Sequence, residues 1–520
     1  MTCWAYLWVI ALLGPLVALV RAADIDKVTD PDNIDANHMR HIDFCYGGQD
    51  EPESLHEQGQ ALMRRVLLAK SMKPVDLPIL LVCGHPAVCS DVIWQLTSNS
   101  TLHLPREQIH VYGHYLAGGM RDARFVDKNP KQSVSLGPLA EVPTAWRLSR
   151  KILAADAGFS QTYADLSRRY PVVICTFPTN QCGGFFQYQP RLLVLHFSHR
   201  WHHHLDAAQA LEFHSWMLEA FPDAGTAAFS IGKFIASPLL TDGAAGKLVL
   251  VANNPLDVHH IYQYLGVLPL CLPSLYGGML DYSYSPLDAP ALNKEREILL
   301  LPHSPATVTA SGAVPSKSSA SSSSPSTSIV EMVRSRLPDG YVLKYSREYL
   351  NRQFHYPELG RWKVAIALPH ATHVAAINEA LAMGIPLILP SHSLLAAMHV
   401  RYNLITQAHL PVPLKVKSGH SAPNAANTAE RSPRLHDLHC DINTNASAGC
   451  LQQWLRLADF FRFPGNTVVK FSHMDALPGQ INRLYLNDTR RREVSERQRA
   501  WIRGMLGVSS EIIWAGLTGL

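Results

Sequence analysis

Residues 363–391 of the chain read KVAIALPHATHVAAINEALAMGIPLILPS. The continuous apolar run at 363–368 predicts a buried strand, and 386–390 predicts a second one. Apolar residues at helical spacing between them predict a helix over 373–383, and Gly384 is of the residue type that commonly ends a helix. A strand, a helix and a strand in this order form the repeating unit of an α/β fold with a parallel sheet.

The same alternation of short apolar runs and helical segments continues in both directions. The expected strands before residue 290 lie at 41–47, 78–84, 108–114, 171–178, 191–198, 247–253 and 269–275. Those after it lie at 297–303, 341–345, 363–368 and 386–390. Because each series is long enough for a sheet of its own, we expect an α/β protein of two doubly wound Rossmann-like domains facing a cleft, with C-terminal helices.

Composition changes divide this series into segments. The stretch 276–294, rich in Gly, Tyr, Ser and Pro, is a natural hinge, and the Ser-rich stretch 303–328 reads as a disordered insertion. The expected organisation is an apolar leader at 1–23, a first Rossmann-like domain at 24–290, a second Rossmann-like domain at 291–480 and C-terminal helices at 481–520. Helices are expected at 493–506 and 511–517 within the last segment.

The overall composition excludes several classes of protein. The chain has 520 residues, of which 47% are hydrophobic and 17% charged, so disorder as the overall state is excluded. Only one stretch approaches the ~18 apolar residues of a membrane span, which excludes a multi-span membrane protein. The 46 basic and 42 acidic residues are spread along the chain, and we therefore expect no nucleic-acid partner.

The N-terminus points to the secretory pathway. Residues 3–20 are almost continuously apolar and precede Arg21-Ala22-Ala23, which resembles a signal-peptide cleavage site. A type II signal anchor, which would attach the protein to a membrane through residues 3–20, and a buried N-terminal helix are the alternatives. We therefore expect a secreted or type II membrane protein of the Golgi or endoplasmic reticulum lumen.

The cysteines and glycosylation sequons agree with that compartment. Eight cysteines lie outside the apolar leader, and Cys83/Cys89 and Cys440/Cys450 are near enough in sequence to form disulfides. Asparagines in N-glycosylation sequons occur at 99, 445 and 487, so a glycoprotein is expected.

The turn between the strand at 363–368 and its following helix is the first candidate binding site. The first amides of a helix lack intrahelical partners and carry the positive end of its dipole, which favours a diphosphate in front of them. Thr372 is suited to cap the helix and to reach a phosphate, while Glu379 can accept hydrogen bonds from a ribose. Lys344 and Arg347 follow another strand of this domain and are candidates to neutralise the charge of a diphosphate, or form a solvated basic edge.

Residues 379–386 resemble the donor motif of GT-B glycosyltransferases. Glu379, Ala380, Ala382, Gly384 and Pro386 match the family's Glu-Ala-x-Ala-x-Gly-x-Pro pattern. The resemblance implies a GT-B fold, a nucleotide-sugar donor that serves as co-substrate without a metal or other cofactor, and ribose binding by Glu379. It also implies that Thr372 and His373 approach the diphosphate.

This chain departs from the family's pattern at one position. Ala371 stands where retaining members of the family have a second glutamate. An ordinary capped strand–helix–strand unit is the alternative interpretation of the whole segment.

Polar residues after strands of the first domain are candidates for the acceptor side. A histidine at a strand end is suited to take the proton of an acceptor hydroxyl, and His199 is preferred to His196 for this catalytic role. Arg200, Asn180 and Asn253 would line the acceptor side of the cleft. Each histidine could equally be a hydrogen-bonded core residue. A zinc site at the 196–204 histidines is disfavoured because the run contains no His-Glu-x-x-His pattern.

From these observations we expect a glycosyltransferase that moves a sugar from a nucleotide sugar to a glycan or glycoconjugate acceptor in the secretory pathway. A non-catalytic secreted binding protein on the same scaffold is the first alternative, motivated by Ala371 and the long polar insertions. A nucleotide-sugar epimerase is the second.

Overall fold

The computed structural model describes most of the expected elements. The described residues are 34–47, 53–69, 78–83, 86–97, 104–105, 108–112, 150–176, 179–197, 207–221, 247–265, 268–276, 280, 296–301, 329–345, 359–360, 362–369, 371, 373–402, 404–405 and 448–518. The predicted leader at 1–23 and the whole of the predicted insertion at 303–328 lie outside them. None of the helices within these ranges is long and apolar enough to cross a bilayer.

Six parallel strands form the first sheet. They are β1 (Ile79–Val82), β2 (Ile109–Tyr112), β3 (Val172–Cys175), β4 (Leu192–Phe197), β5 (Lys247–Ala252) and β6 (Leu270–Cys271). Their order across the sheet is β2-β1-β3-β4-β5-β6, and every pairing is parallel. Helices cover a parallel sheet on both faces, so every residue of a central strand is buried. The ILLV of β1 is buried at all positions, which explains why such strands are continuous apolar runs in the sequence.

The second sheet has five parallel strands and repeats this pattern. They are β7 (Arg296–Leu300), β8 (Tyr341–Tyr345), β9 (Ala365–Ile366), β10 (Leu387–Pro390) and β11 (Val469–Phe471), in the order β11-β10-β9-β7-β8. In each sheet the first strand lies between the second and the third. The strand order therefore reverses between β1 and β3 in one sheet and between β7 and β9 in the other, and such reversals open crevices at the carboxyl ends of the strands.

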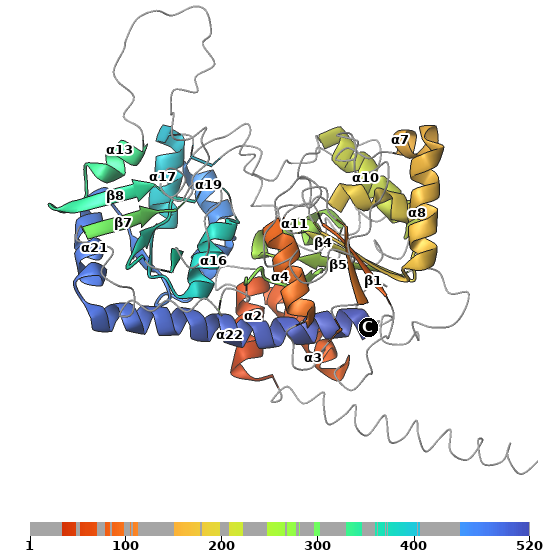
Figure 1. Cartoon of the computed structure of the whole chain (residues 1–520), viewed down its shortest axis with the longest axis horizontal. Helices are drawn as coiled ribbons and strands as arrows, with labels where there is room; N and C mark the ends of the chain where they lie inside the picture. Colours follow the sequence, from red (N-terminus) through yellow and green to blue (C-terminus); the bar gives the residue numbers. More distant parts are fainter. Residues whose placement is uncertain are drawn as a thin grey trace, which may run out of the picture.

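Helices surround the two sheets (Figure 1). Those of the first unit are α2 (Ala36–Cys45), α3 (Glu53–Ala69), α4 (Pro86–Thr97), α7 (Arg150–Ala155), α8 (Ala157–Arg169), η6 (Thr179–Gly183), α9 (Gly184–Tyr188), α10 (Ala207–Ala220) and α11 (Pro255–Leu265). Those of the second are α13 (Ile329–Arg334), α16 (Ala375–Met383), α17 (His392–Tyr402), α19 (Ala448–Leu455), α20 (Asp459–Arg462), η12 (Met474–Ala476) and α21 (Leu477–Tyr485). The predicted α/β class with two parallel sheets is confirmed.

The long helix α22 (Asp488–Thr518) joins the two units. Its 31 residues span about 46 Å at the usual rise per residue. It runs below both units in Figure 1, packing on α16 at one end and on α2, α3 and α4 further along. Trp501 contacts the rings of Phe44 in α2 and Phe463 after α20, with ring centroids 5.5 and 5.0 Å apart. The two helices predicted here are one helix, because burial of its apolar side holds it together through Gly507.

One predicted strand is wrong. The segment 41–47 belongs to helix α2, which begins after Asp35 and ends at Cys45. The Asp35 carboxylate accepts hydrogen bonds from the amides of Asn37 and His38, at 2.8 and 3.0 Å, and so caps the helix. Residues 38, 41, 42 and 45 are spaced three or four apart or adjacent, as on one face of a helix. In α2 the side chains of His38, His41, Ile42 and Cys45 are buried.

Among the residues that the structure describes, three disulfides stabilise the first unit. Cys83–Cys89 was among the pairs that the sequence spacing allowed, whereas Cys45–Cys271 and Cys175–Cys182 were not predicted. Cys440 lies outside the described residues. Cys45–Cys271 joins α2 to β6 across 226 residues of sequence, a separation that no local pattern reveals.

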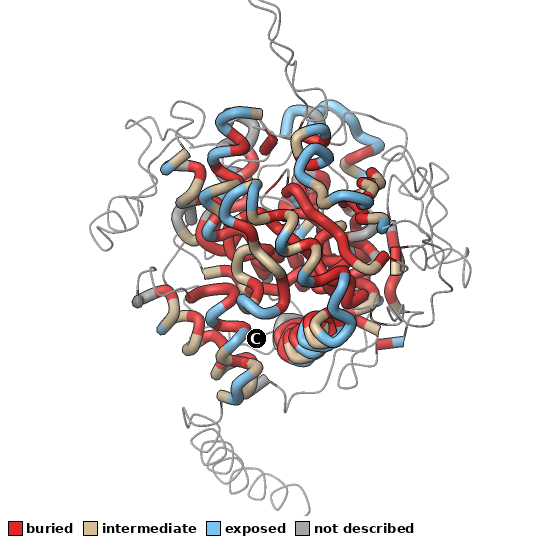
Figure 2. Tube along the Cα trace, turned by 90° about the vertical axis from the view of Figure 1, so that its left-hand side faces the viewer, coloured by how far each residue is buried: buried red, intermediate tan, exposed pale blue. Residues whose placement is uncertain are grey.

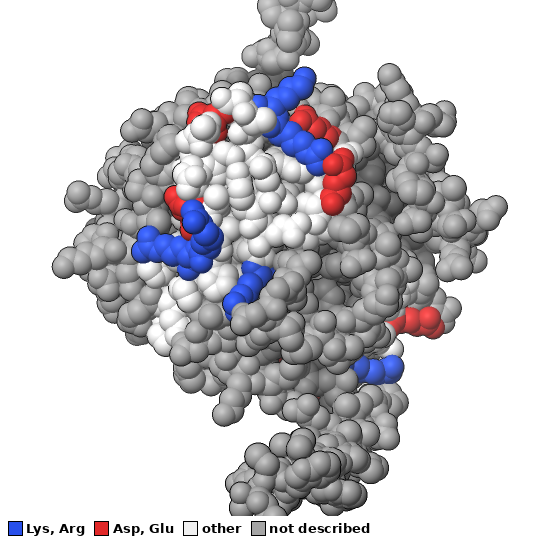
Figure 3. Space-filling model, turned by 90° about the vertical axis from the view of Figure 1, so that its right-hand side faces the viewer, with Lys and Arg blue, Asp and Glu red and all other residues white. Residues whose placement is uncertain are grey.

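The buried residues form a core that runs through both units. Figure 2 shows buried chain in the interior and helices whose outer sides are exposed. On the face drawn in Figure 3, basic and acidic side chains of the described residues lie near one another instead of forming a broad patch of one sign.

Candidate functional site between the two sheets

The carboxyl ends of strands from both sheets meet at a buried junction. His196 is next to last in β4, and its imidazole interacts electrostatically with that of His373, which follows β9. Asn378 of α16 donates a hydrogen bond across the junction to the backbone carbonyl of Ser274, after β6, at 3.1 Å. Helix α16 therefore faces the first unit with the same segment that carries the predicted donor motif.

The centre of the junction is the carboxylate of Asp459, at the start of α20. The Nδ1–H group of His373 donates to its Oδ2 at 2.5 Å, and both side chains are 2% exposed. Asn378 Nδ2 donates to the same oxygen at 2.9 Å, while the amide of Phe460 donates to Oδ1 at 2.7 Å. Three hydrogen bonds thus hold a buried carboxylate in place, and the carboxylate fixes the orientation of the His373 ring.

A second chain of buried polar groups approaches from the first unit. Asn253 Nδ2, just after β5, donates to Ser274 Oγ at 3.0 Å. Asn254 Nδ2 donates to Asn253 Oδ1 and to Asp257 Oδ2, both at 2.6 Å, and its own Oδ1 accepts from the Asp257 amide. Asn378 donates to the Ser274 carbonyl and to Asp459, which also accepts from His373. Hydrogen bonds therefore link a series of residues from Asp257 in α11, across the junction, to His373.

His196 is neutral at physiological pH. Burial lowers its pKa from 6.5 to about 4, because the charged imidazole loses its hydration. The charge of His373 lowers the pKa of His196 further, whereas a backbone hydrogen bond with Leu272 raises it. Its ring also borders an apolar cavity of about 40 Å³ between β3, β4, β5 and the end of α22.

The junction is closed in this structure. Phe44, Asn253, Ser274, Asn378 and Asp459 surround part of it together with apolar side chains of α22, and the gap that they leave cannot hold a water molecule. Access of a substrate to these groups therefore requires the two units to separate.

The predicted donor-side residues that the structure describes lie at three different places. His373 is in the junction, and Glu379 is buried in α16, 6% exposed. Lys344 lies on β8, where its Nζ is 3.3 Å from the carboxylate of Glu297 on β7. Thr372 and Arg347 lie outside the described residues.

On the acceptor side, the junction contains His196 and Asn253, from two neighbouring strands. The backbone of Asn180 belongs to η6, after β3, and nothing further is described of this residue. His199 and Arg200 lie outside the described residues. Of the histidines considered for proton transfer, His196 is the one whose surroundings are defined.

Sequence reasoning missed three residues of the junction. Asp459 follows a stretch without a recognisable pattern, and only the folded chain brings it to His373, 86 residues earlier. Ser274 lies at the end of an expected strand, which was a usable signal, since side chains there face the crevice. Asn378 directly precedes Glu379, the first residue of the motif. It lies within the helix predicted over 373–383, one turn after Val374, so its place on that helix could be predicted.

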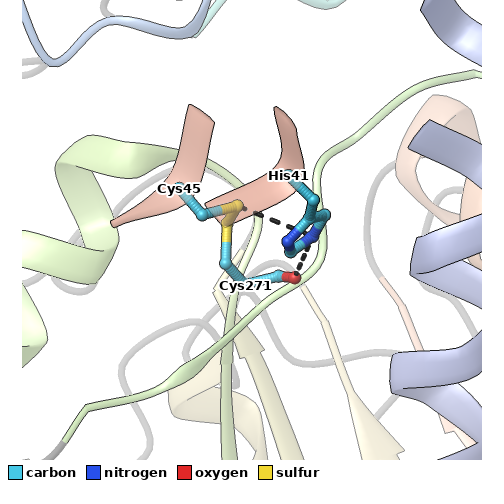
Figure 4. A group of neighbouring side chains, drawn as sticks. All are labelled: His41, Cys45 and Cys271. Atoms are coloured by element: carbon cyan, nitrogen blue, oxygen red, sulfur yellow. Dashed lines mark hydrogen bonds between the residues drawn. A yellow bond between two sulfur atoms is a disulfide. The ribbon is translucent and has the colours of Figure 1, made fainter. Parts of the chain in front are cut away.

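One group of side chains among the described residues has the spacing of a metal site. His41, Cys45 and Cys271 have their nitrogen and sulfur atoms within 4.8 Å of one another (Figure 4). The two sulfurs form the Cys45–Cys271 disulfide, and His41 Nε2 lies 3.1 Å from the Cys271 carbonyl. Burial lowers the pKa of His41 to about 3. Because the disulfide occupies both sulfurs, we interpret this group as structural.

Comparisons with known proteins add no assignment: no protein-family model matches the chain, and no curated protein sequence is significantly similar to it.

Proposed function

We propose that the protein is a glycosyltransferase of GT-B type, which moves a sugar from a nucleotide-sugar donor to a glycan or glycoconjugate acceptor in the lumen of the secretory pathway. The observation that carries the proposal is the junction itself. Two parallel sheets with the same strand order meet through the carboxyl ends of their strands, where open α/β sheets bind their ligands. The motif at 379–386 begins on α16, the helix that faces this junction.

The donor is proposed to bind at the strand reversal between β7 and β9. In this proposal, the amino end of the nine-residue helix α16 would face the diphosphate. Glu379 would accept hydrogen bonds from the ribose once the two units have separated. Lys344 and Arg347 would supply positive charge near the leaving diphosphate, and no metal is required in this scheme.

Transfer requires a base for the acceptor hydroxyl. As the hydroxyl oxygen attacks the anomeric carbon, the bond from that carbon to the diphosphate oxygen breaks and the hydroxyl proton passes to the base. His199 and His196 are the bases that the sequence favours. His373 is a third, because Asp459 holds its Nδ1–H and leaves Nε2 as the basic nitrogen.

A panel of nucleotide sugars tests the proposal. UDP-, GDP- and CMP-sugars are each added to the purified protein and the melting temperature is recorded. Stabilisation by one donor is expected, because a ligand that binds only the folded chain stabilises it by mass action. Mass-spectrometric product analysis then separates transfer from epimerisation.

Replacement of Glu379 by alanine is expected to weaken binding of that donor at least tenfold, since a ribose would lose a carboxylate acceptor worth about 1.5–3 kcal/mol. Titration calorimetry measures the dissociation constant. Glu331→Ala, on the exposed side of α13, is the matched control and should leave it within twofold. Equal affinity of the Glu379 variant and the wild type would contradict the ribose role.

A non-catalytic binding protein is the second candidate, favoured by the closed junction in which buried polar groups bond to one another. Failure of every nucleotide sugar in the panel to stabilise the chain would support this alternative against the transferase.

A further inference from the structure

Helix α22 is held against α2 near its end by His38. The Nε2 atom of His38 lies 2.7 Å from the Oε2 atom of Glu511, and its Nδ1 atom lies 2.8 Å from the Oδ1 atom of Asp35. A carboxylate oxygen therefore lies beside each ring nitrogen. Only the protonated imidazole carries a hydrogen on both nitrogens, whereas the neutral ring turns a lone pair toward one of the two carboxylates. The contact therefore fits the charged form of His38.

The surroundings of His38 favour that charge. α2 packs against α3, α11 and α22, and of these α22 supplies the charged group that faces His38, the carboxylate of Glu511. Asp35 and His41 act on it from its own helix and its cap. Burial lowers the pKa of His38, but hydrogen bonds and charge interactions with Glu511 and Asp35 raise it by more, to above 6.5. Burial lowers the pKa of His41 to about 3, so this neighbour stays neutral.

Glu511 lies near the end of the helix that closes the junction. α22 packs on α16 of the second unit and on α2, α3 and α4 of the first (Figure 1). Its residues Trp501 and Ile502 border the closed gap beside Asp459, and Glu511 follows about 14 Å further along the helix axis. A contact that fixes this end of α22 on α2 therefore also stabilises the closed arrangement of the two units.

A second contact between the units keeps its charge over the same pH range. The Arg462 guanidinium, in α20, donates to the carbonyls of Asp43 and Phe44 near the end of α2, at 3.3 and 3.2 Å. Burial lowers the pKa of Arg462 only to about 10, so it is charged at neutral pH. Loss of the charge on His38 is therefore expected to loosen the closed arrangement without abolishing it.

We propose that the ionic contact of His38 with Glu511 and Asp35 is a pH-dependent clamp on the junction. In mild acid it holds the end of α22 on α2 and keeps the junction closed. As the pH rises above 6.5 the contact weakens, and the junction opens more readily. A ligand would thus be admitted at neutral pH and excluded in an acidic compartment. This inference concerns opening alone and does not depend on whether the junction transfers a sugar.

Hydrogen exchange of the full chain, measured by mass spectrometry, tests the clamp. Exchange is followed at pH 6.5, 7.5 and 8.5, and each rate is divided by the intrinsic rate at that pH. Protection of residues 504–513 in the wild type should fall at least fivefold from pH 6.5 to pH 8.5, while that of strands β4 and β10 should change less than twofold. The buried histidines with lowered pKa values cannot produce this loss, because they stabilise the folded chain as the pH rises.

A charge-removing variant isolates the contact. Glu511→Gln keeps the shape of the side chain but not its charge, so its protection at pH 6.5 should already resemble that of the wild type at pH 8.5 and vary less than twofold with pH. Glu493→Gln, on the same helix, is the matched control: its carboxylate pairs with Arg490 and Arg497, and the wild-type response should persist. A full pH response in E511Q, or an equal loss of protection in β4 and β10, would overturn the clamp.

A second measurement on the wild type applies if the Glu511 variant does not fold. Exchange of the imidazole C2 hydrogen with deuterium, followed against pH, gives the pKa of an individual histidine. The midpoint for His38 should lie above 6.5 and coincide with the loss of protection in residues 504–513. A midpoint at or below 6.5, or protection that stays constant through it, would show that His38 does not control the end of α22.

Discussion

Replacing Asp459 by alanine is expected to lower the free energy of unfolding by about 3–5 kcal/mol. The carboxylate is buried and accepts hydrogen bonds from His373, Asn378 and the Phe460 amide. Alanine leaves all three donors without their acceptor and vacates the space between the two units. The loss exceeds that of an ordinary surface substitution because the donors are buried with the carboxylate, the His373 side chain at 2% exposure, and an unsatisfied buried donor costs its desolvation.

Urea denaturation of the full chain, followed by tryptophan fluorescence, measures this effect. Asp475→Ala is the matched control: Asp475 pairs with Arg336 at the surface, and its loss should change the free energy by no more than about 0.5–1 kcal/mol. Asp459→Asn should lie between the two, since the amide oxygen still accepts one of the hydrogen bonds. A stability of D459A equal to that of the control would show that the junction contributes little to the fold.

Most strands of the fold could be predicted from the sequence because a parallel strand is buried on both faces. Runs such as VVIC in β3 and LILP in β10 are then apolar at every position and stand out against their surroundings. β11, with its partly exposed Val469 and Lys470 at the edge of the second sheet, gives no such run and was not predicted. The segment 41–47 failed for the opposite reason, since a short apolar run fits a strand and a buried helix equally well.

The candidate site could be predicted only where a strand end or a motif marked it. His196, Asn253 and His373 lie in, end or follow predicted strands, and in the structure the charges of His196 and His373 interact. Asp459 and the Cys45–Cys271 disulfide depend on contacts between distant segments, for which one sequence contains no local signal.

Mild acid is expected to destabilise the folded chain steeply between pH 6.5 and pH 4. Burial lowers the pKa of His41 to about 3 and those of His196 and His259 to about 4, whereas each imidazole titrates near 6.5 in the unfolded chain. Between these values the unfolded chain binds protons that the folded chain excludes, so stability is complete above pH 6.5 and falls as the pH is lowered. At about 1.4 kcal/mol per pH unit for each histidine, the three together give a slope of about 4 kcal/mol per unit.

His38 opposes this trend. Burial lowers its pKa, but hydrogen bonds and charge interactions with Glu511 and Asp35 raise it by more, so its contribution is present at low pH and is lost as the pH rises. Urea denaturation at half-unit steps from pH 7.5 to pH 4.5 measures the net slope. His196→Gln keeps a donor for the Leu272 carbonyl but does not titrate, and it should reduce the slope by about 1.4 kcal/mol per unit. His473→Gln, at an exposed position before η12, should leave the slope as in the wild type. If the His196 variant kept the full slope, the imidazole in the junction would be accepting its proton in the folded chain, and the closed, dry junction would not describe the protein in solution.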